Sequence, residues 1–370
     1  MALRHHNAAL VLALLRAAGE AGVSRLELAA HTGLTPQAVS KITARLRSEG
    51  LAVDAGRRAS TGGKPRTVLR LDPTARWAVG VHLDRDEVTT VLADLAGSPR
   101  RVRTAALDLG GRVEEVLAVV ADEVAAALAE VEPSRVLGVG VASPGPLDHD
   151  RGVLGPVTGV PRLAGFPLRR ALAERTGLPV VVDKDTNAAA LGLTREPVVS
   201  AVGPARPRDT FAYLHLGTGL GAGLVIGGLL HRGERTAAGE FGHQVLQLDG
   251  PQCVCGKRGC VEALALAAVA RGEIARAARV LGVAARNLVE LLDVDHVVLG
   301  GRVALAHPDT FLAGVGQALG APERRTPGVT TPGVSFPEAG ARVVADGAAH
   351  LVLAPLFSGD APTLPAPAVP

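Results

Sequence analysis

One histidine and three cysteines lie close together in this chain and constrain its folding more than any other feature. They are His243, Cys253, Cys255 and Cys260, and the sequence contains no other cysteine. An imidazole and three thiolates are sufficient for a closed tetrahedral zinc site, and sulfur ligands favour zinc over magnesium or calcium. Because the chain supplies all four ligands, no position is left for a reactive water, so we expect a structural Zn²⁺. The alternative is three reduced, buried cysteines beside an unrelated histidine.

Length and composition predict several structural units with an aliphatic interior. The chain has 370 residues, of which 47% are hydrophobic and only 2% aromatic. That length exceeds what one compact core accommodates. No apolar run reaches the roughly 18 residues of a membrane span. The apolar stretch 8–18 is interrupted by Arg16, so we interpret it as a core helix. We therefore expect a cytoplasmic protein without a membrane partner.

The first 50 residues carry the signals of three short helices. Residues 7–18 have helical apolar spacing, and Ser24 with Glu27 forms a capping box that opens a second helix, ending near Thr32. Thr35 is an N-cap residue and Pro36 stands at the first helical position of a third helix, which runs to about residue 48. Two short helices joined by a tight turn predict a helix-turn-helix.

A basic hairpin follows these helices and completes a winged helix-turn-helix. Strands are expected at 51–54 and 67–71, around a loop with two adjacent glycines. The third helix can enter the DNA major groove, and the basic wing can contact phosphates or the minor groove. We therefore expect double-stranded DNA as partner, although a helical domain that binds protein is the alternative. The predicted DNA-contacting residues are Thr35, Gln37, Ser40, Lys41, Arg45, Arg57, Arg58, Lys64 and Arg66.

Several motifs in the rest of the chain resemble those of one protein family. The segment Gly-Glu-Phe-Gly-His at 239–243, followed by Cys-x-Cys-Gly-x-x-Gly-Cys-x-Glu at 253–262, closely resembles the signature of the ROK family of repressors, open reading frames and kinases. Further matching stretches are Gly80-Val81, 93–97, 143–146, 177–183, 187–192, 216–223 and 297–301. The resemblance covers nearly the whole chain. It includes the winged helix-turn-helix, which the family's repressors carry and its kinases lack.

The resemblance implies an α/β fold in which two actin-like (RNase H-like) lobes of the sugar-kinase type close on a sugar. We expect a DNA-binding domain at 1–72 and a first lobe at 76–200, joined by a C-terminal helix near 345–357. A second lobe with the zinc site is expected at 201–344, and a disordered tail at 358–370. Only about 34 residues separate Glu262 from the stretch at 297–301, so this lobe is expected to be shortened, with one or two Ala-rich helices.

The resemblance also implies a sugar pocket. Asp185 matches the family's catalytic base, and Glu240, His243 and Glu262 match residues that contact sugar hydroxyls. Two further positions depart from the family pattern, because Arg162 and Lys184 stand where asparagine is usual. Either cation could favour an acidic or phosphorylated effector, and Lys184 could instead pair with Asp185. The same replacements are equally consistent with a pocket that has lost its ligand.

The first phosphate-binding loop of the family's kinases is replaced here. Their Asp-x-Gly-Gly-Thr corresponds to His82-Leu83-Asp84-Arg85-Asp86, followed by Glu87, whereas a second glycine turn is kept at 217–221. Three carboxylates near a triphosphate would be repulsive, so we expect no catalysis. The sequence predicts a repressor of carbohydrate-related genes that acts as a homodimer or homotetramer and responds to a sugar. The alternatives are an ATP-dependent sugar kinase with a DNA-binding arm, and a regulator that responds to a partner protein.

Overall fold

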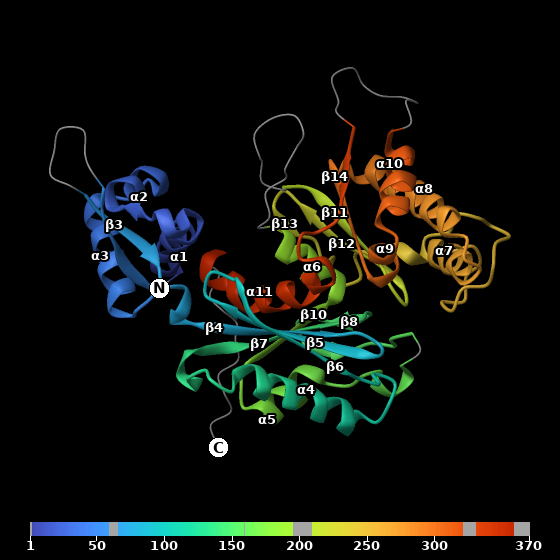
Figure 1. Ribbon diagram of the computed structural model, residues 1–370, viewed down its shortest axis with the longest axis horizontal. Helices are drawn as coiled ribbons and strands as arrows, with labels where there is room; N and C mark the ends of the chain where they lie inside the picture. The colour runs from blue at the N-terminus through green and yellow to red at the C-terminus, as the bar shows by residue number, and fades with distance from the viewer. Residues whose placement is uncertain (1, 59–65, 159, 195–208, 321–330, 359–370) are drawn as a thin grey trace.

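The N-terminal part of the computed structural model is a small helical domain with a three-stranded sheet (Figure 1). The structure describes residues 2–58, 66–158, 160–194, 209–320 and 331–358. The domain consists of α1 (Ala2–Ala18), β1 (Val23–Ser24), α2 (Arg25–Thr32), α3 (Pro36–Ser48), β2 (Ala52–Arg58) and β3 (Arg66–Leu71). The strands pair antiparallel in the order β1-β3-β2. The first helix begins five residues earlier than the sequence analysis expected.

Local capping interactions explain where the helices of this domain begin. The Ser24 hydroxyl accepts a hydrogen bond from the Glu27 amide at 3.3 Å, and the Glu27 carboxylate accepts one from the Ser24 amide at 2.7 Å. The Thr35 hydroxyl accepts a hydrogen bond from the Ala38 amide at 3.2 Å. These bonds satisfy amides that have no partner within the helix. The predicted capping box and N-cap are therefore confirmed.

The first lobe is built on a five-stranded sheet in the order β10-β7-β4-β5-β6. Its strands are β4 (Trp77–Leu83), β5 (Glu87–Asp94), β6 (Pro99–Ala106), β7 (Val136–Ser143) and β10 (Val180–Lys184). The pairs β4/β7 and β7/β10 are parallel, and the other two are antiparallel. Helices α4 (Val113–Leu128) and α5 (Leu168–Thr176) cover one face. A short hairpin of β8 (Leu147–Asp148) and β9 (Val153–Leu154) extends toward the second lobe.

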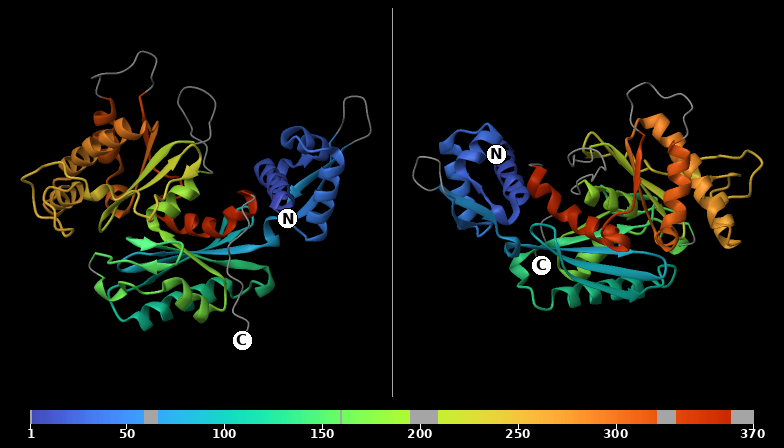
Figure 2. Two further views of the ribbon diagram at one scale, coloured as in Figure 1. Left: turned by 180° about the vertical axis from the view of Figure 1, so that it is seen from behind. Right: turned by 45° about the horizontal axis from the view of Figure 1, so that its top comes forward.

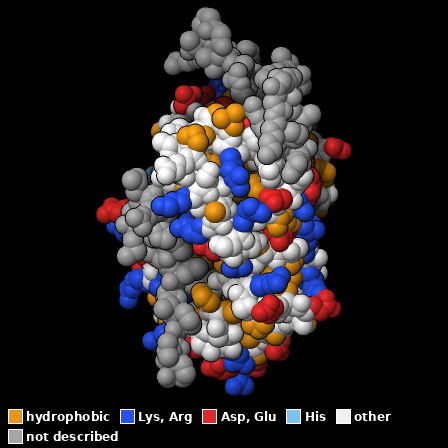
Figure 3. Space-filling model, turned by 90° about the vertical axis from the view of Figure 1, so that its left-hand side faces the viewer, with side chains coloured by type: hydrophobic (Ala, Val, Ile, Leu, Met, Phe, Trp, Pro, Cys, Tyr) orange, Lys and Arg blue, Asp and Glu red, His pale blue; other side chains and the backbone are white. Residues whose placement is uncertain are grey.

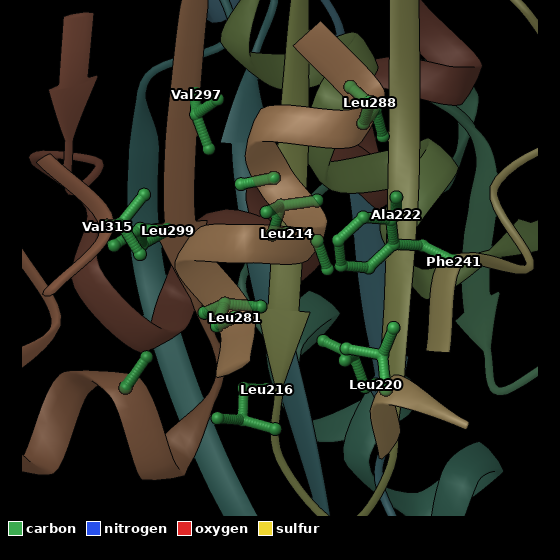
Figure 4. Close-up of a cluster of buried hydrophobic side chains, with 14 of the residues drawn as sticks. Leu214, Leu216, Leu220, Ala222, Phe241, Leu281, Leu288, Val297, Leu299 and Val315 are labelled. Atoms are coloured by element: carbon green, nitrogen blue, oxygen red, sulfur yellow. The ribbon is translucent and has the colours of Figure 1, made fainter. Parts of the chain in front are cut away.

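The second lobe has a five-stranded sheet in the order β13-β12-β11-β14-β15. These strands are β11 (Phe211–Leu216), β12 (Leu220–Ile226), β13 (Leu229–Leu230), β14 (His296–Gly300) and β15 (Gly333–Ser335). One face is covered by α7 (Val261–Ala270), α8 (Ile274–Leu292), α9 (Arg302–Ala306) and α10 (Pro308–Gly320). Leu281 of α8 packs with Leu214 and Leu299 of the sheet in an aliphatic core (Figure 4). Where one or two Ala-rich helices were expected after Glu262, the structure has two, α7 and α8, and the first of them begins at Val261.

A single buried helix, α11 (Val343–Ser358), lies between the two sheets (Figures 1 and 2). Glycines allow its close packing, since a Cβ on Gly80 of β4 or Gly140 of β7 would overlap carbonyl oxygens of α11. Gly347 of α11 packs in the same way on Ala188 of α6 (Asp185–Leu193). The segment 340–358 is long and apolar enough to cross a membrane. Its packing against both lobes instead identifies it as a core helix.

The N-terminal domain is packed onto the rest of the molecule through a shared core. Leu15 of α1 belongs to the same buried cluster as Val91 of β5 and Leu353 of α11. The Arg16 guanidinium carbon lies 3.6 Å from the centre of the Phe357 ring, a cation–π contact. The connection at residues 72–75 is an ordered 3-10 turn capped by Asp72. The N-terminal domain therefore has a fixed orientation on the first lobe.

Candidate functional site

A cleft between the two lobes is lined by six parts of the chain, one of which is the first-lobe segment with Val157, Thr158 and Val160. The first lobe supplies the ends of β4 and β7 and the junction of β10 with α6. The second lobe supplies the turn between β11 and β12 and the segment that carries the cysteines. The lining residues with ionisable side chains are Asp84, Arg85, Lys184, Asp185, His215, Glu240, His243 and Glu262.

The predicted zinc ligands converge beside this cleft. One donor atom from each of His243, Cys253, Cys255 and Cys260 lies within 4.8 Å of every other. The Cys253 sulfur is 3.7 Å from His243 Nδ1, and the sulfurs of Cys255 and Cys260 are 3.6 Å apart without a disulfide. Three sulfurs and one imidazole nitrogen in this proximity fit the ligand set of structural zinc. The cluster can therefore hold a metal ion.

Two carboxylates lie next to the cysteine cluster and line the cleft. Glu240 precedes the short 3-10 helix that contains His243, and Glu262 is in the first turn of α7, two residues after Cys260. The Glu262 carboxylate accepts a hydrogen bond from the Leu220 amide at 2.8 Å, which fixes it against the glycine turn. Because His243 Nδ1 faces the sulfurs, its other ring nitrogen is left for the cleft.

Asp185 lies opposite these groups at the start of α6. Its carboxylate accepts a hydrogen bond from the Thr186 amide at 2.6 Å. Burial raises the pKa of Asp185 above its usual value, although His215 and Lys184 act in the opposite direction. An aspartate in this position is able to accept hydrogen bonds from ligand hydroxyls.

A group of three rings near Asp185 was not predicted from the sequence, and two of them, His82 and Tyr213, are buried. The Tyr213 hydroxyl lies 3.0 Å from His215 Nδ1, and the ring of His215 meets that of His82 edge to face at 6.3 Å. Burial, followed by the positive charge of His215, lowers the pKa of His82 to about 4. These residues belong to strands of different lobes, β4 and β11. The sequence offered one signal for this group: His82, Tyr213 and His215 are ring-bearing residues within apolar stretches that form strands.

Lys184 makes a different contact from the expected one. It does not pair with Asp185, because its side chain extends across the cleft to the second lobe. Lys184 Nζ donates to the Ala238 carbonyl at 2.6 Å and to Glu240 Oε1 at 3.2 Å, and only 3% of the side chain is exposed. Beside it, Asp183 accepts a hydrogen bond from Arg232 Nε at 2.7 Å. Lys184 is thus a neutralised link between the lobes.

Arg162 lies outside the cleft, contrary to the expectation that it contacts an effector. It is exposed in the turn 161–163, and the cleft is lined there by Val157, Thr158 and Val160 instead. The physical reason is that Leu163 is buried in the core of the first lobe, which turns the neighbouring arginine toward solvent. Of the two predicted cations, Arg162 is therefore outside the cleft, and Lys184 lines the cleft but is already bound by the second lobe.

The residues that replace the first phosphate loop are also paired differently from the expectation. Asp84 and Asp86 are both bound by Arg302 of α9, whereas Glu87 is exposed at the start of β5. The expected repulsion from three carboxylates is therefore reduced by a cation that was not foreseen. The second glycine stretch forms a tight turn between β11 and β12, with the Gly217 amide bonded to the Gly219 carbonyl at 2.9 Å.

The exposed face of α3 carries the polar residues that were predicted to contact DNA. Thr35, Gln37, Ser40, Lys41 and Arg45 are all exposed, while Val39 and Leu46 are buried. On this side of the molecule, Lys and Arg side chains are spread among uncharged ones (Figure 3). Arg57, Arg58 and Arg66 lie on β2 and β3, and Lys64 and the tail 359–370 lie outside the described residues.

A winged helix joined to two α/β lobes around a polar cleft defines an actin-like fold of the sugar-kinase type with an N-terminal winged helix-turn-helix domain. The chain belongs to the ROK family, whose family model matches residues 80–272. It is 28% identical over 335 residues to a putative xylose repressor of Caldicellulosiruptor sp. (strain Rt8B.4), covering 78% of this chain and 82% of that protein. It is also 28% identical over 247 residues to the xylose repressor of Bacillus subtilis (strain 168), covering 65% of this chain and 61% of that protein.

Two solved structures support the same fold. A ROK family transcriptional regulator, described as a homologue of the E. coli Mlc protein, superposes with a TM-score of 0.77 at 20% identity. That match covers 97% of this chain and 98% of the other. A ROK hexokinase from Thermus thermophilus superposes with a TM-score of 0.58 at 30% identity, covering 74% of this chain and 96% of that enzyme. The regulator thus matches nearly all of this chain, and the kinase about three quarters.

Proposed function

We propose that this protein is a DNA-binding repressor of carbohydrate-related genes, controlled by a neutral sugar in the interlobe cleft. The observation that carries the proposal is the fixed attachment of a winged helix to a two-lobed domain whose cleft is lined with sugar-type hydrogen-bonding groups. The names of two relatives, both xylose repressors, support it. We place the protein in the cytoplasm as a homodimer or homotetramer on double-stranded DNA.

In the DNA-binding step, α3 lies in the major groove with its N-terminal residues facing base edges. Gln37 can form a bidentate pair with adenine, and Lys41 can bind guanine or a phosphate. Arg45 lies 3.6 Å from Glu49, and both side chains are close to half exposed, so a DNA phosphate can replace Glu49 as its partner. The wing residues Arg57, Arg58, Lys64 and Arg66 would add phosphate or minor-groove contacts.

The charge of the cleft favours a neutral sugar over an acidic one. Four lining carboxylates, from Asp84, Asp185, Glu240 and Glu262, face two lining cations, Arg85 and Lys184. Lys184 is already held by Glu240 and a carbonyl oxygen. Carboxylates accept hydrogen bonds from vicinal hydroxyls, whereas a phosphate here would meet net negative charge. D-Xylose is the first candidate, because two relatives bear its name.

In this proposal zinc is structural. It would not contact the sugar, but would hold the residues that do. Bound by His243, Cys253, Cys255 and Cys260, it would crosslink the segment that carries Glu240 and Glu262. It would also fix the orientation of the imidazole, whose second nitrogen faces the cleft. The sugar is then bound by side chains of the protein, and the carboxylates of Asp185, Glu240 and Glu262 accept hydrogen bonds from its hydroxyl groups. Arg162 takes no part in this proposal, since it is exposed outside the cleft.

Kinase activity is the alternative, and the family's kinases together with the retained Asp185 favour it. Against it stands the segment 82–86, which has side chains where a phosphate loop needs glycines. A coupled assay with Mg-ATP and a hexose and pentose panel decides between the two. Turnover that disappears in Asp185→Asn would establish the kinase and refute our proposal of a non-enzymatic regulator.

The DNA-binding proposal is tested by genomic DNA capture followed by fluorescence anisotropy on a captured site. Lys41→Ala should weaken binding by about 1–3 kcal/mol and reduce the salt slope by about one. Arg170→Ala, which removes an exposed cation from α5, is the matched control and should leave both unchanged. Equal effects of the two substitutions would refute the assignment of α3 to DNA.

The effector is tested by calorimetric titration with D-xylose, D-glucose and a sugar phosphate. Glu240→Gln should weaken sugar binding by about 1 kcal/mol, since the amide oxygen still accepts a hydrogen bond but the acceptor loses its charge. Glu174→Gln on the surface of α5 is its control. Tighter binding of the phosphate than of the free sugar would refute the neutral-ligand assignment.

A further inference from the structure

One arginine connects the two lobes at the edge of the cleft. Arg302 is the first residue of α9, directly after Gly301, and it reaches the end of β4 in the other lobe. Its Nη2 lies 2.7 Å from Asp84 Oδ2, and its Nη1 lies 2.9 Å from Asp86 Oδ2. Both terminal nitrogens of one planar guanidinium are therefore used, on carboxylates more than 200 residues earlier in the chain.

The three charges stabilise one another and are held in position from both sides. Burial opposes ionisation of Asp84, but the hydrogen bonds from Arg302 and from the Arg85 amide lower its pKa below the usual value. The carboxylates in turn raise the pKa of Arg302. Asp84 is only 16% exposed, whereas Asp86 is 65% exposed. The contact between Arg302 and Asp84 is thus better shielded from solvent than the contact between Arg302 and Asp86.

The backbone that presents Arg302 is also fixed. Gly301 has a φ of 87°, and a Cβ at this position would overlap the carbonyl of Leu216 at the end of β11. A residue with a side chain is therefore excluded here. The position of the α9 backbone relative to the second sheet is therefore restricted.

Asp84 belongs both to this contact and to the lining of the cleft. At another part of the cleft, Lys184 of the first lobe binds Glu240 and Ala238 of the second. His149 of the β8–β9 hairpin lies 2.8 Å from Thr236 Oγ1. The described residues therefore connect the lobes at several points around the cleft.

We propose that Arg302, Asp84 and Asp86 form an interlobe clasp that holds the two lobes together at the edge of the cleft. Arg302 is then a positioning residue, which acts on the effector through Asp84. By the family resemblance, the clasp occupies the region where a kinase would bind phosphates. The inference goes beyond the proposed function, because it concerns how the two lobes are held relative to each other.

The test uses the full-length protein and three substitutions. Arg302→Ala removes the clasp, and Arg302→Lys keeps the charge but not the planar bidentate contact. Arg286→Ala, which breaks a pair within α8 of the second lobe, is the matched control. Hydrogen exchange of the turn 84–87 and of α9 is measured together with the radius of gyration by X-ray scattering. Circular dichroism verifies that each variant is folded. Labels on cysteine are avoided, because every cysteine is a proposed zinc ligand.

For Arg302→Ala we expect roughly three- to tenfold faster exchange in both segments and a larger radius of gyration. Arg302→Lys should lie between the wild type and Arg302→Ala, and Arg286→Ala should match the wild type. D-Xylose affinity should fall by a similar factor in Arg302→Ala. Unchanged exchange and radius in folded Arg302→Ala would overturn the clasp. If the wild type binds no sugar, the proposed effector fails, while the scattering and exchange results still decide on the clasp.

Discussion

Replacing Gly347 with alanine should force apart α11, the buried helix between the sheets, and α6, the helix that begins at the cleft. An added Cβ would lie 2.9 Å from the Ala189 nitrogen and would overlap the carbonyl of Ala188, both backbone atoms of α6. Relief requires a shift of roughly 1 Å or more, since ordinary contacts lie near 3.5 Å. Overpacking of this kind costs about 1–3 kcal/mol, which outweighs the gain of about 0.5–1 kcal/mol from alanine in a helix.

The matched control is Gly316→Ala in α10, where the nearest atom to an added Cβ is Val334 Cγ1 at 3.6 Å. This substitution should gain the helix contribution without a clash. Because the helix contribution is common to both substitutions, the two variants should differ by about 1–3 kcal/mol in the free energy of unfolding, measured by urea denaturation. Because α6 begins with Asp185, Gly347→Ala should also weaken sugar binding. Equal stability of the two variants would refute the close packing of α11 on α6.

Further predictions concern the metal site and the buried acid. Removal of the metal with a chelator should release one zinc per chain, measured by elemental analysis. It should also weaken sugar binding, measured by calorimetry. Unchanged sugar affinity would show that zinc does not support the binding site. Asp185→Asn should stabilise the fold at pH 7, because the raised pKa of Asp185 means that its ionised form opposes folding. When folding raises the pKa of an acid, the free energy of unfolding falls as the pH rises from the pKa of the unfolded state to that of the folded state. The advantage of the variant should therefore vanish below about pH 4. Constant stabilisation down to pH 3 in thermal unfolding would contradict this assignment.

Features that depend on short stretches of sequence were predictable here. The capping box at Ser24, the N-cap Thr35 and the two helices after Glu262 follow from local patterns, and the structure has them. The two-lobed α/β fold class was also predicted correctly through the motifs shared with the family. The cysteine spacing predicted a cluster, and the four donors do converge.

Contacts between the lobes were not predictable from local patterns. The partners of Lys184 lie more than 50 residues away, and those of Arg302 more than 200. Arg162 was misplaced for a different reason, because the burial of Leu163 decides which way the turn faces. In each case the outcome depends on how separate elements pack, which neither spacing nor residue type records.

The fixed N-terminal domain has a consequence for exchanging DNA specificities between family members. Leu15 and Arg16 of α1 rest on Leu353 and Phe357 of α11, at the far end of the chain. A chimera that replaces only residues 1–72 would join two surfaces that did not evolve together. A chimera with a new DNA specificity should therefore also carry the C-terminal part of α11 from Leu353 to Phe357, because this part packs against the transferred domain.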